Sequence, residues 1–518
     1  MNRFLLSLLD APRGISGAQG VAVSQHYKAS QTGAEIIAAG GTAMDAAVAM
    51  AFVIGIVEPW MSGLGGTGYM LVGRYGETPE VIDFSTRSPL DLPVEKYMVV
   101  GGKDDMHPWP RVEDDCNTKG ALAICAPTIT PGLELGWLRH GRMPWADLVK
   151  PARQIAMLGQ TIDWYTQLII ASAASDLQSD PDAANLFLEP DGTGRSTGWT
   201  SLISKEIKHH KLADSLELIA IKGAKTLQNG DLAHAIVSDI RHKGGVLKIE
   251  DFTATKPSVQ KPIHIKFKNE SQLWTVPGLS GGPTIAALLS AWEKHGSPDI
   301  DNPLPSVLSA RSVLQDRFLH LGDGYEDATA PSCTTSYCVI DCSGLIVAAT
   351  LTLVSIFGSK VISPSTGILI NNAISWFDPV AGKPNSLAAG KKPLTNMAPC
   401  FIQTNDGNLT ALSAAGGRRI VPALAQVAAY NLLSGNKMES ALAKPRLDLR
   451  GDGTITADAR FPKASLEQLR SKVNVDLALP TVFPYHFAIV NAAEYSKSGK
   501  ITGFCEPMCP NAVTTTVS

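Results

Sequence analysis

The 518-residue sequence lacks several features that mark particular classes of protein. It has no block of basic residues and its formal net charge is −3, which argues against a nucleic-acid partner. No run of 18 or more apolar residues is present, and the apolar stretch 46–57 has the length of a buried helix, so no membrane-spanning segment is expected. Repeats and low-complexity tracts are missing too. The hydrophobic content of 44% and charged content of 18% indicate a well-buried globular enzyme.

Metal-binding patterns are also missing. Among the eight cysteines, Cys505 and Cys509 are four residues apart, but neither a second pair nor a histidine cluster accompanies them. The sequence therefore predicts no metal site and no cofactor. Asp10 interrupts the apolar residues near the N-terminus, so we expect no signal peptide and a cytoplasmic protein with free thiols.

A β-hairpin is predicted between residues 334 and 352. Residues 334–341 alternate polar and apolar side chains and include β-branched residues, residues 341–344 contain turn-forming types, and an apolar run from 345 leads to Thr350 and Thr352. Periodicity alone is equally compatible with two ordinary core strands that happen to be rich in threonine.

A second notable pattern is the G-x-G-x-x-G spacing of Gly63, Gly65 and Gly68. In a dinucleotide-binding fold this motif follows a strand and opens a helix. Here a helical run precedes the glycines and residues 69–72 after them are typical of a strand. The order is reversed, so we reject a dinucleotide site.

The residues around these two patterns resemble the γ-glutamyltranspeptidase family. The resemblance covers the block 28–72, continues in order through roughly residue 460, and includes the strand that begins Thr334-Thr335-x-Tyr337. It implies the four-layer αββα sandwich of N-terminal-nucleophile hydrolases. It also implies that the precursor cuts itself between Cys333 and Thr334, giving a large fragment 1–333 and a small fragment 334–518 that stay together as a heterodimer.

The same resemblance implies the catalytic roles. Thr334 would be the nucleophile, Thr352 would hydrogen-bond it, and the backbone N–H groups of Gly416 and Gly417 would stabilise the oxyanion. The chemistry is reasonable, because a threonine hydroxyl needs an adjacent base. The α-amine freed by cleavage, with a reference pKa of about 7.7–8.0, can serve as that base.

The predicted substrate pocket departs from the family pattern. The arginine that grips the glutamyl carboxylate aligns with Ser85, and Arg87 is a candidate replacement. The family's asparagine, polar residue and aspartate align with Val354, Ala373 and Trp376, while its paired serines become Thr395 and Asn396, which still donate hydrogen bonds. Most of the charged clamp is therefore missing, and Trp376 offers an apolar wall instead.

We consider three functional hypotheses. The first is a self-processing amidase or acylase with a non-glutamyl small-molecule substrate. The second is a conventional γ-glutamyl hydrolase or transferase (glutathione hydrolase) whose headgroup is bound by other residues, such as Arg87, Arg418 or Arg419. The third is an unprocessed pseudoenzyme that serves as a scaffold.

Two segments, 103–117 and 174–200, are predicted to be surface excursions.

Overall fold

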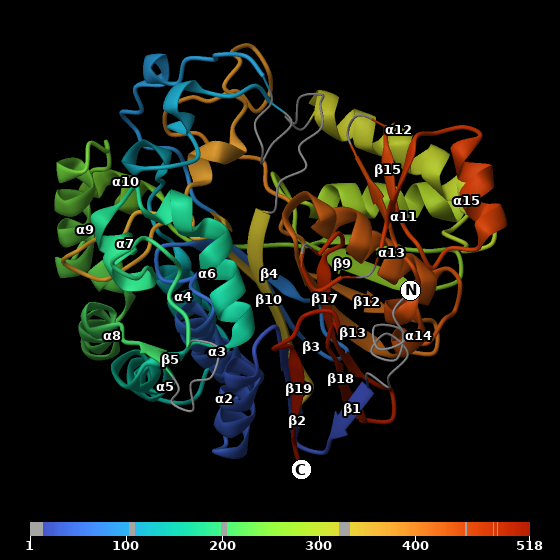
Figure 1. Ribbon diagram of the computed structural model, residues 1–518. Coiled ribbons are helices and arrows are strands. Elements are labelled where there is room, and N and C mark those ends of the chain that lie inside the picture. Colours follow the sequence, from blue (N-terminus) through green and yellow to red (C-terminus); the bar gives the residue numbers. More distant parts are fainter. Residues whose placement is uncertain are drawn as a thin grey trace.

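Two seven-stranded antiparallel sheets face each other at the centre of the molecule (Figure 1). The computed structural model describes residues 14–102, 109–197, 205–320, 332–450, 453–479, 481–483 and 485–518. The first sheet has the order β19 (Val513–Val517), β2 (Gly20–Ser24), β10 (Ser332–Asp341), β11 (Leu345–Ser355), β3 (Thr67–Arg74), β4 (Glu80–Phe84), β7 (Ser258–Gln260). The second has the order β1 (Gly14–Gly17), β18 (Ile501–Phe504), β17 (Ile489–Tyr495), β13 (Leu409–Ala415), β12 (Cys400–Gln403), β9 (Gln272–Thr275), β8 (Ile263–Lys266).

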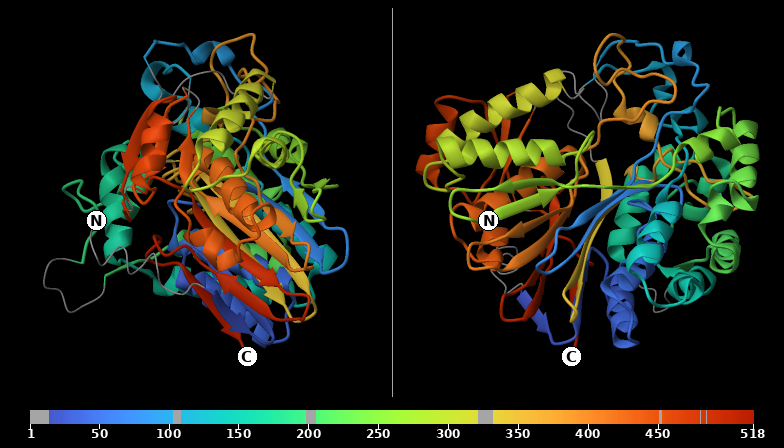
Figure 2. Two further views of the ribbon diagram at one scale, coloured as in Figure 1. Left: turned by 90° about the vertical axis from the view of Figure 1, so that its right-hand side faces the viewer. Right: turned by 180° about the vertical axis from the view of Figure 1, so that it is seen from behind.

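Helices cover the outer face of each sheet, as the rotated views show (Figure 2). The side of the first sheet carries α2 (Tyr27–Ala38), α3 (Ala43–Val57), α4 (Ile129–His140), α5 (Trp145–Leu158), α6 (Trp164–Leu177), α7 (Pro181–Phe187), α8 (His210–Lys222), α9 (Asp231–His242) and α10 (Ile249–Ala254). The side of the second carries α11 (Gly282–His295), α12 (Leu304–His320), α13 (Ile420–Leu432), α14 (Met438–Ala443) and α15 (Lys463–Arg470). The layers follow the order αββα, as the resemblance implies.

Smaller elements complete the chain. A three-stranded sheet of β14 (Leu447–Leu449), β15 (Ile455–Asp458) and β16 (Val475–Ala478) lies beside α15, and β5 (Gln160–Thr161) pairs with β6 (Glu206–Ile207). Short 3₁₀ helices are η1 (Val94–Lys96), η2 (Glu113–Asp115), η3 (Ala121–Ala123), η4 (Ala224–Leu227), η5 (Ala373–Trp376) and η6 (Gly417–Arg419). Among the described residues, no helix combines the length and apolar character needed to cross a bilayer.

Side-chain alternation along β10 divides its residues between two apolar cores. Tyr337 and Val339 belong to the core between the first sheet and its helices. Cys338 and Ile340 belong to the core between the two sheets. Because successive side chains of a strand point to opposite faces, the polar residues that precede them are divided in the same way.

The buried helix α3 contains the apolar stretch 46–57 and begins at Ala43. Thr42 caps it, with its side chain accepting the Asp45 N–H at 3.1 Å while the Asp45 carboxylate accepts the Thr42 N–H at 2.8 Å. Asp341, at the end of β10, accepts the N–H of Ala43 at 2.7 Å. The predicted hairpin turn is thereby joined to the helix behind the sheet. The glycine motif lies between α3 and the strand β3, which confirms the helix-then-strand order that excludes a dinucleotide site.

The prediction of surface excursions is wrong for part of each segment. In the second, α7 forms at Pro181–Phe187, and Phe187 is buried against Phe357 with ring centroids 4.8 Å apart. Asp180 caps this helix rather than marking a loop, since its carboxylate accepts two N–H groups of the first turn. In the first segment, Trp109 and Val112 are buried, whereas residues 103–108 lie outside the described part.

Candidate active site

Thr334 lies at the beginning of β10 and is almost completely buried, with 3% of its surface exposed. Alternation along the strand places it on the face between the sheets, the face that Ser336 and Cys338 share. Both neighbours contact the second sheet, because Ser336 Oγ accepts from Asn491 Nδ2 at 3.0 Å and Cys338 Sγ lies 3.3 Å from Ser413 Oγ. Thr335 faces the helices instead.

A β-bulge lies beside Thr334. Cys333 is opposite Val354 and Thr335 is opposite Leu351, so β11 carries one extra residue at this point. Val354 has φ = 87°, a left-handed conformation that is a true outlier for a β-branched residue. Such strain is kept only where the surroundings enforce it, and bulges near active sites redirect side chains.

Thr352 belongs to this bulge. Its Oγ accepts the N–H of Val354 at 2.7 Å, so the hydroxyl holds the strained backbone and keeps its own proton for donation. Thr350 is opposite Tyr69 of β3, whose side chain belongs to the core between the sheets. Thr352 is two residues farther along β11, so its side chain lies on the same face. The structure thus brings Thr334 and Thr352 to the same end of the same face.

Gly416 and Gly417 reach this end from the second sheet. Along β13, Ala411 and Ser413 contact Cys338, and the strand continues toward the beginning of β10, where η6 contacts it. Gly416 has φ = 142°, and a Cβ there would lie 2.9 Å from the Cα of Ala488, so both conformation and space require glycine. Gly417 opens η6, which leads directly into α13, so its N–H lies at the positive end of a helix.

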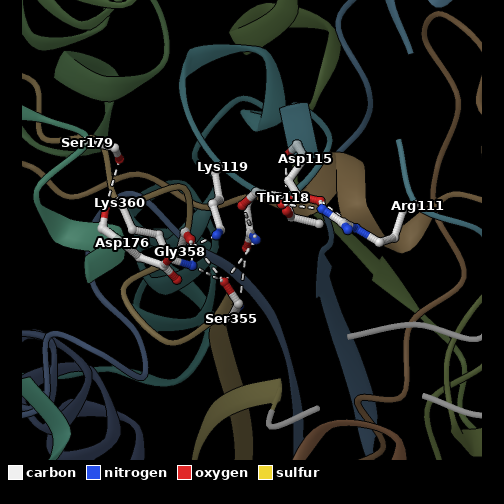
Figure 3. A network of polar contacts seen from close by, with 10 residues as sticks. Arg111, Asp115, Thr118, Lys119, Asp176, Ser179, Ser355, Gly358 and Lys360 are labelled. Atoms are coloured by element: carbon white, nitrogen blue, oxygen red, sulfur yellow. Dashed lines mark hydrogen bonds and ion pairs between the residues drawn. The ribbon is translucent and has the colours of Figure 1, made fainter. Parts of the chain in front are cut away.

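A polar network supports the other side of the bulge (Figure 3). Ser355, opposite Ser332 in the ladder, donates its N–H to Asn372 Oδ1 at 3.1 Å and accepts from Asn372 Nδ2 at 2.9 Å. The buried Lys360 ammonium donates to Ser355 Oγ at 3.1 Å and to the Gly358 carbonyl at 3.0 Å. Lys360 itself has φ = 65°. Farther out, the ion pair of Lys119 and Asp176 (2.7 Å) continues the network.

The three positions where the family carries clamp residues share one environment. Val354, Ala373 and Trp376 are all buried and belong to the apolar core between the sheets. Ser85, at the arginine position, donates its hydroxyl to Asp83 at 2.6 Å, and Asp83 also pairs with Lys392 at 2.9 Å.

The candidate replacement arginines make other contacts. Arg87 donates to the Gly390 carbonyl at 3.1 Å. Arg418 forms a bidentate pair with Asp448 (2.8 Å for each bond), and Arg419 lies 3.7 Å from the same carboxylate. A bidentate guanidinium–carboxylate pair uses the geometry that a substrate carboxylate would need.

Thr395 and Asn396 lie beside the start of α11. Thr395 is buried, and its N–H donates to the Leu279 carbonyl at 3.0 Å, whereas Asn396 is half-buried. Burial raises the pKa of the Tyr69 phenol, whose hydroxyl hydrogen-bonds the Thr395 and Ser85 side chains. Among the described residues, no group of three or more histidine, cysteine, aspartate or glutamate side chains is placed to hold a metal ion.

Sequence reasoning missed Lys360, Asn372 and Arg317 as parts of this region. Arg317 lies within the range that the resemblance covers, but the resemblance implies no role for it. The sequence gives no sign that the Lys360 side chain is buried. Its partners Ser355 and Gly358 come close to its ammonium group because the chain turns between them through residues with positive φ.

The chain is similar to known proteins over most of its length. The sequence model of the family described as Gamma-glutamyltranspeptidase matches residues 29–303 and 305–513. Glutathione hydrolase 2 of Arabidopsis thaliana is 26% identical over 84% of this chain and 81% of its own length. The Acylase ACY 1 proenzyme of Pseudomonas sp. (strain V22) is 28% identical over 94% of this chain and 92% of its own length.

Among solved structures, cephalosporin acylase from Bacillus halodurans superposes with a TM-score of 0.84 at 20% identity, covering 98% of each chain. That likeness confirms the fold. The match of the family model over nearly the whole sequence establishes the relationship: the chain belongs to the γ-glutamyltranspeptidase family of enzymes.

Proposed function

We propose that this protein is a self-processing threonine hydrolase that cleaves an amide or related acyl bond on a small molecule with a non-glutamyl acyl group. Cleavage between Cys333 and Thr334 would yield fragments 1–333 and 334–518, which remain associated because β10 lies between β2 of the large fragment and β11 of the small one. The relative named a proenzyme supports this maturation.

In the proposed reaction, the Thr334 hydroxyl attacks the acyl carbon and passes its proton to the α-amine that cleavage has freed. The negative charge that develops on the acyl oxygen is met by the N–H groups of Gly416 and Gly417, and Thr352 orients the nucleophile. Collapse of the tetrahedral intermediate expels the amine, which takes the proton, and leaves an ester on Thr334. Water then attacks this ester by the same route, releases the acid and restores the threonine.

The observation that carries the substrate assignment is the shared apolar environment of Val354, Ala373 and Trp376. A glutamyl group has an ammonium and a carboxylate, and burying either without an opposite charge costs several kcal/mol, on the order of 3–5. The arginines that the second hypothesis needs are engaged with Gly390 and Asp448. An acyl group without the ammonium fits these walls better.

The first test is the intact mass of the purified protein, with the new N-terminus sequenced. Two fragments that meet at Cys333 and Thr334 are expected. Thr334→Val should abolish both cleavage and turnover, by at least about a thousandfold, because it removes only the nucleophilic oxygen. Thr335→Val is the matched control: it removes a neighbouring hydroxyl that faces the helices and should still be processed.

The substrate assignment is tested with two p-nitroanilides that share a five-carbon acyl chain. The pentanoyl compound should be hydrolysed with a higher kcat/KM than the γ-glutamyl compound. Efficient γ-glutamyl release would favour the second hypothesis instead, and an uncut chain without activity toward either compound would favour the scaffold.

A further inference from the structure

Arg317 of α12 is a buried arginine that contacts the predicted substrate-binding residues. Only 4% of it is exposed. Its Nη2 donates to the Thr395 carbonyl at 3.1 Å and to Asn396 Oδ1 at 2.9 Å. Its Nη1 donates to the Ser280 carbonyl at 3.1 Å and to Thr284 Oγ at 2.8 Å.

These four contacts join two parts of the chain. Residues 279–281 and 395–397 already share two backbone hydrogen bonds, from the Thr395 N–H to Leu279 and from the Gly281 N–H to Met397, each 3.0 Å long. Arg317 binds both segments at once. If the chain is cut after Cys333, Arg317 lies in the large fragment and Asn396 in the small one, so this contact then holds the pocket together across the fragment boundary.

The chemistry of the guanidinium determines which way the Asn396 amide points. Arginine only donates hydrogen bonds, so the amide must present its oxygen to Arg317. Its NH₂ group is left at the other end of the side chain. A serine hydroxyl, which the resemblance implies for the paired positions, can rotate to donate or accept, whereas Asn396 in this arrangement has only its NH₂ donors left for a further partner.

We propose that Arg317 is a positioning residue that fixes Asn396 as a hydrogen-bond donor, and that the enzyme therefore prefers acyl groups with an oxygen acceptor near their distal end. This inference rests on the proposed function, since it takes Asn396 as part of the acyl pocket. It is consistent with Trp376, because no acid stands at that position to attract an ammonium, while a carbonyl oxygen beside an apolar wall needs only a donor.

The test uses the mature wild-type enzyme with pentanoyl p-nitroanilide and 4-oxopentanoyl p-nitroanilide. The two differ only in a ketone at C4, the carbon that bears the ammonium in a γ-glutamyl group. We expect the oxo compound to have a kcat/KM about tenfold higher, the value of one hydrogen bond in a desolvated site. Equal values for the two compounds would overturn the inference while leaving the proposed function intact.

Two variants attribute the preference to the contact. Asn396→Asp keeps a partner for Arg317 but, as a carboxylate, has no donor, so the ratio of the two kcat/KM values should fall to about one. Arg317→Met should reduce the preference to about twofold or less, mainly through KM of the oxo compound, because the amide is free to turn. The matched control is Arg311→Met, an exposed arginine of the same helix, which should retain the full preference.

The outcomes separate the possible failures. If Arg317→Met does not fold, Asn396→Asp decides, and a full tenfold preference in that variant would refute the role of the amide. If wild type hydrolyses neither anilide, the proposed function fails and takes this inference with it.

Discussion

The beginning of β10 and the pocket beside it lie in one layer of the molecule, yet the resemblance implies that they have diverged from the family pattern to very different extents. At the beginning of β10, the threonines and the glycine pair implied by the resemblance are all present and lie on one face. In the pocket, the positions of the asparagine, the polar residue and the aspartate all carry apolar side chains in one core. The difference is what the proposed function requires, a retained reaction on a changed acyl group.

The contrast has a physical basis. A nucleophile, its base and an oxyanion hole are needed for any acyl substrate, so their geometry tolerates little change. A charged clamp serves one headgroup only. Once that headgroup is not bound, an unpaired buried charge is costly and apolar packing replaces it.

Replacement of Trp376 has the largest expected effect on stability and tests whether this residue is part of the core. Trp376→Ala should lower the free energy of unfolding by about 3–5 kcal/mol, because a buried aromatic side chain leaves a cavity. Trp376→Phe should cost less and preserve the preference for pentanoyl over γ-glutamyl p-nitroanilide. The measurement is urea denaturation together with kcat/KM for both compounds. A rise in γ-glutamyl hydrolysis in the phenylalanine variant would show that Trp376 excludes that headgroup by size rather than by polarity.

Gly416→Ala tests the catalytic end. The left-handed φ of 142° and the approach of Ala488 should displace the backbone N–H groups, so kcat should fall by about 10²–10³-fold with little change in KM. Gly435→Ala is the matched control, since Gly435 also has a positive φ (67°) but no atom within 4 Å of the added Cβ. Equal kcat in both variants would remove the glycine pair from the proposed oxyanion hole.

Some features of the fold and the site can be predicted from the sequence, and others cannot. The hairpin, the buried helix over 46–57 and the αββα layers follow from alternation, an apolar run of helical length and family resemblance. The bulge does not, because a valine is among the residues least expected at a positive φ, and the hydrogen bond from its N–H to Thr352 Oγ is not visible in the alternation of the strand.

Contacts between residues that are far apart in the sequence cannot be predicted from the sequence either. Arg317 and Asn396 are brought together by α12 and the segment that follows Gly390, and neither has a neighbour in sequence that indicates the contact. The prediction of a surface excursion at 174–200 is partly wrong because aspartates are typical of both loops and helix caps. Asp180 is the cap of α7.

The smallest effect that we predict is a pH dependence at the catalytic end. Glu58 lies at the start of the loop that follows α3. This loop contacts the chain next to the bulge, because the carbonyl of Met61 accepts the N–H of Leu353 and the carbonyl of Trp60 accepts the N–H of Phe357. Glu58 is completely buried, and among the described residues neither carboxyl oxygen has a hydrogen-bond partner. Burial, assisted by the negative charge of Asp163, raises the pKa of Glu58 from 4.5 to about 8.

Because folding raises this pKa, the folded state binds the Glu58 proton more tightly than the unfolded state does. Its stabilising contribution is complete below pH 4.5 and is lost as the pH rises through about 8. Glu58→Gln is neutral at every pH, so it should be more stable than wild type by about 2–4 kcal/mol at pH 9 and nearly equal to it at pH 5.

Urea denaturation at pH 5, 7 and 9 measures this difference, and the exposed Glu35→Gln on α2 serves as the control that should show no such trend. Comparison with a variant is needed because burial also lowers the pKa of His209 to about 4, so wild type loses stability as the pH falls from 6.5 toward that value for an unrelated reason. A Glu58→Gln variant that is less stable than wild type at pH 9 would mean that the carboxylate is ionised and paired in the fold.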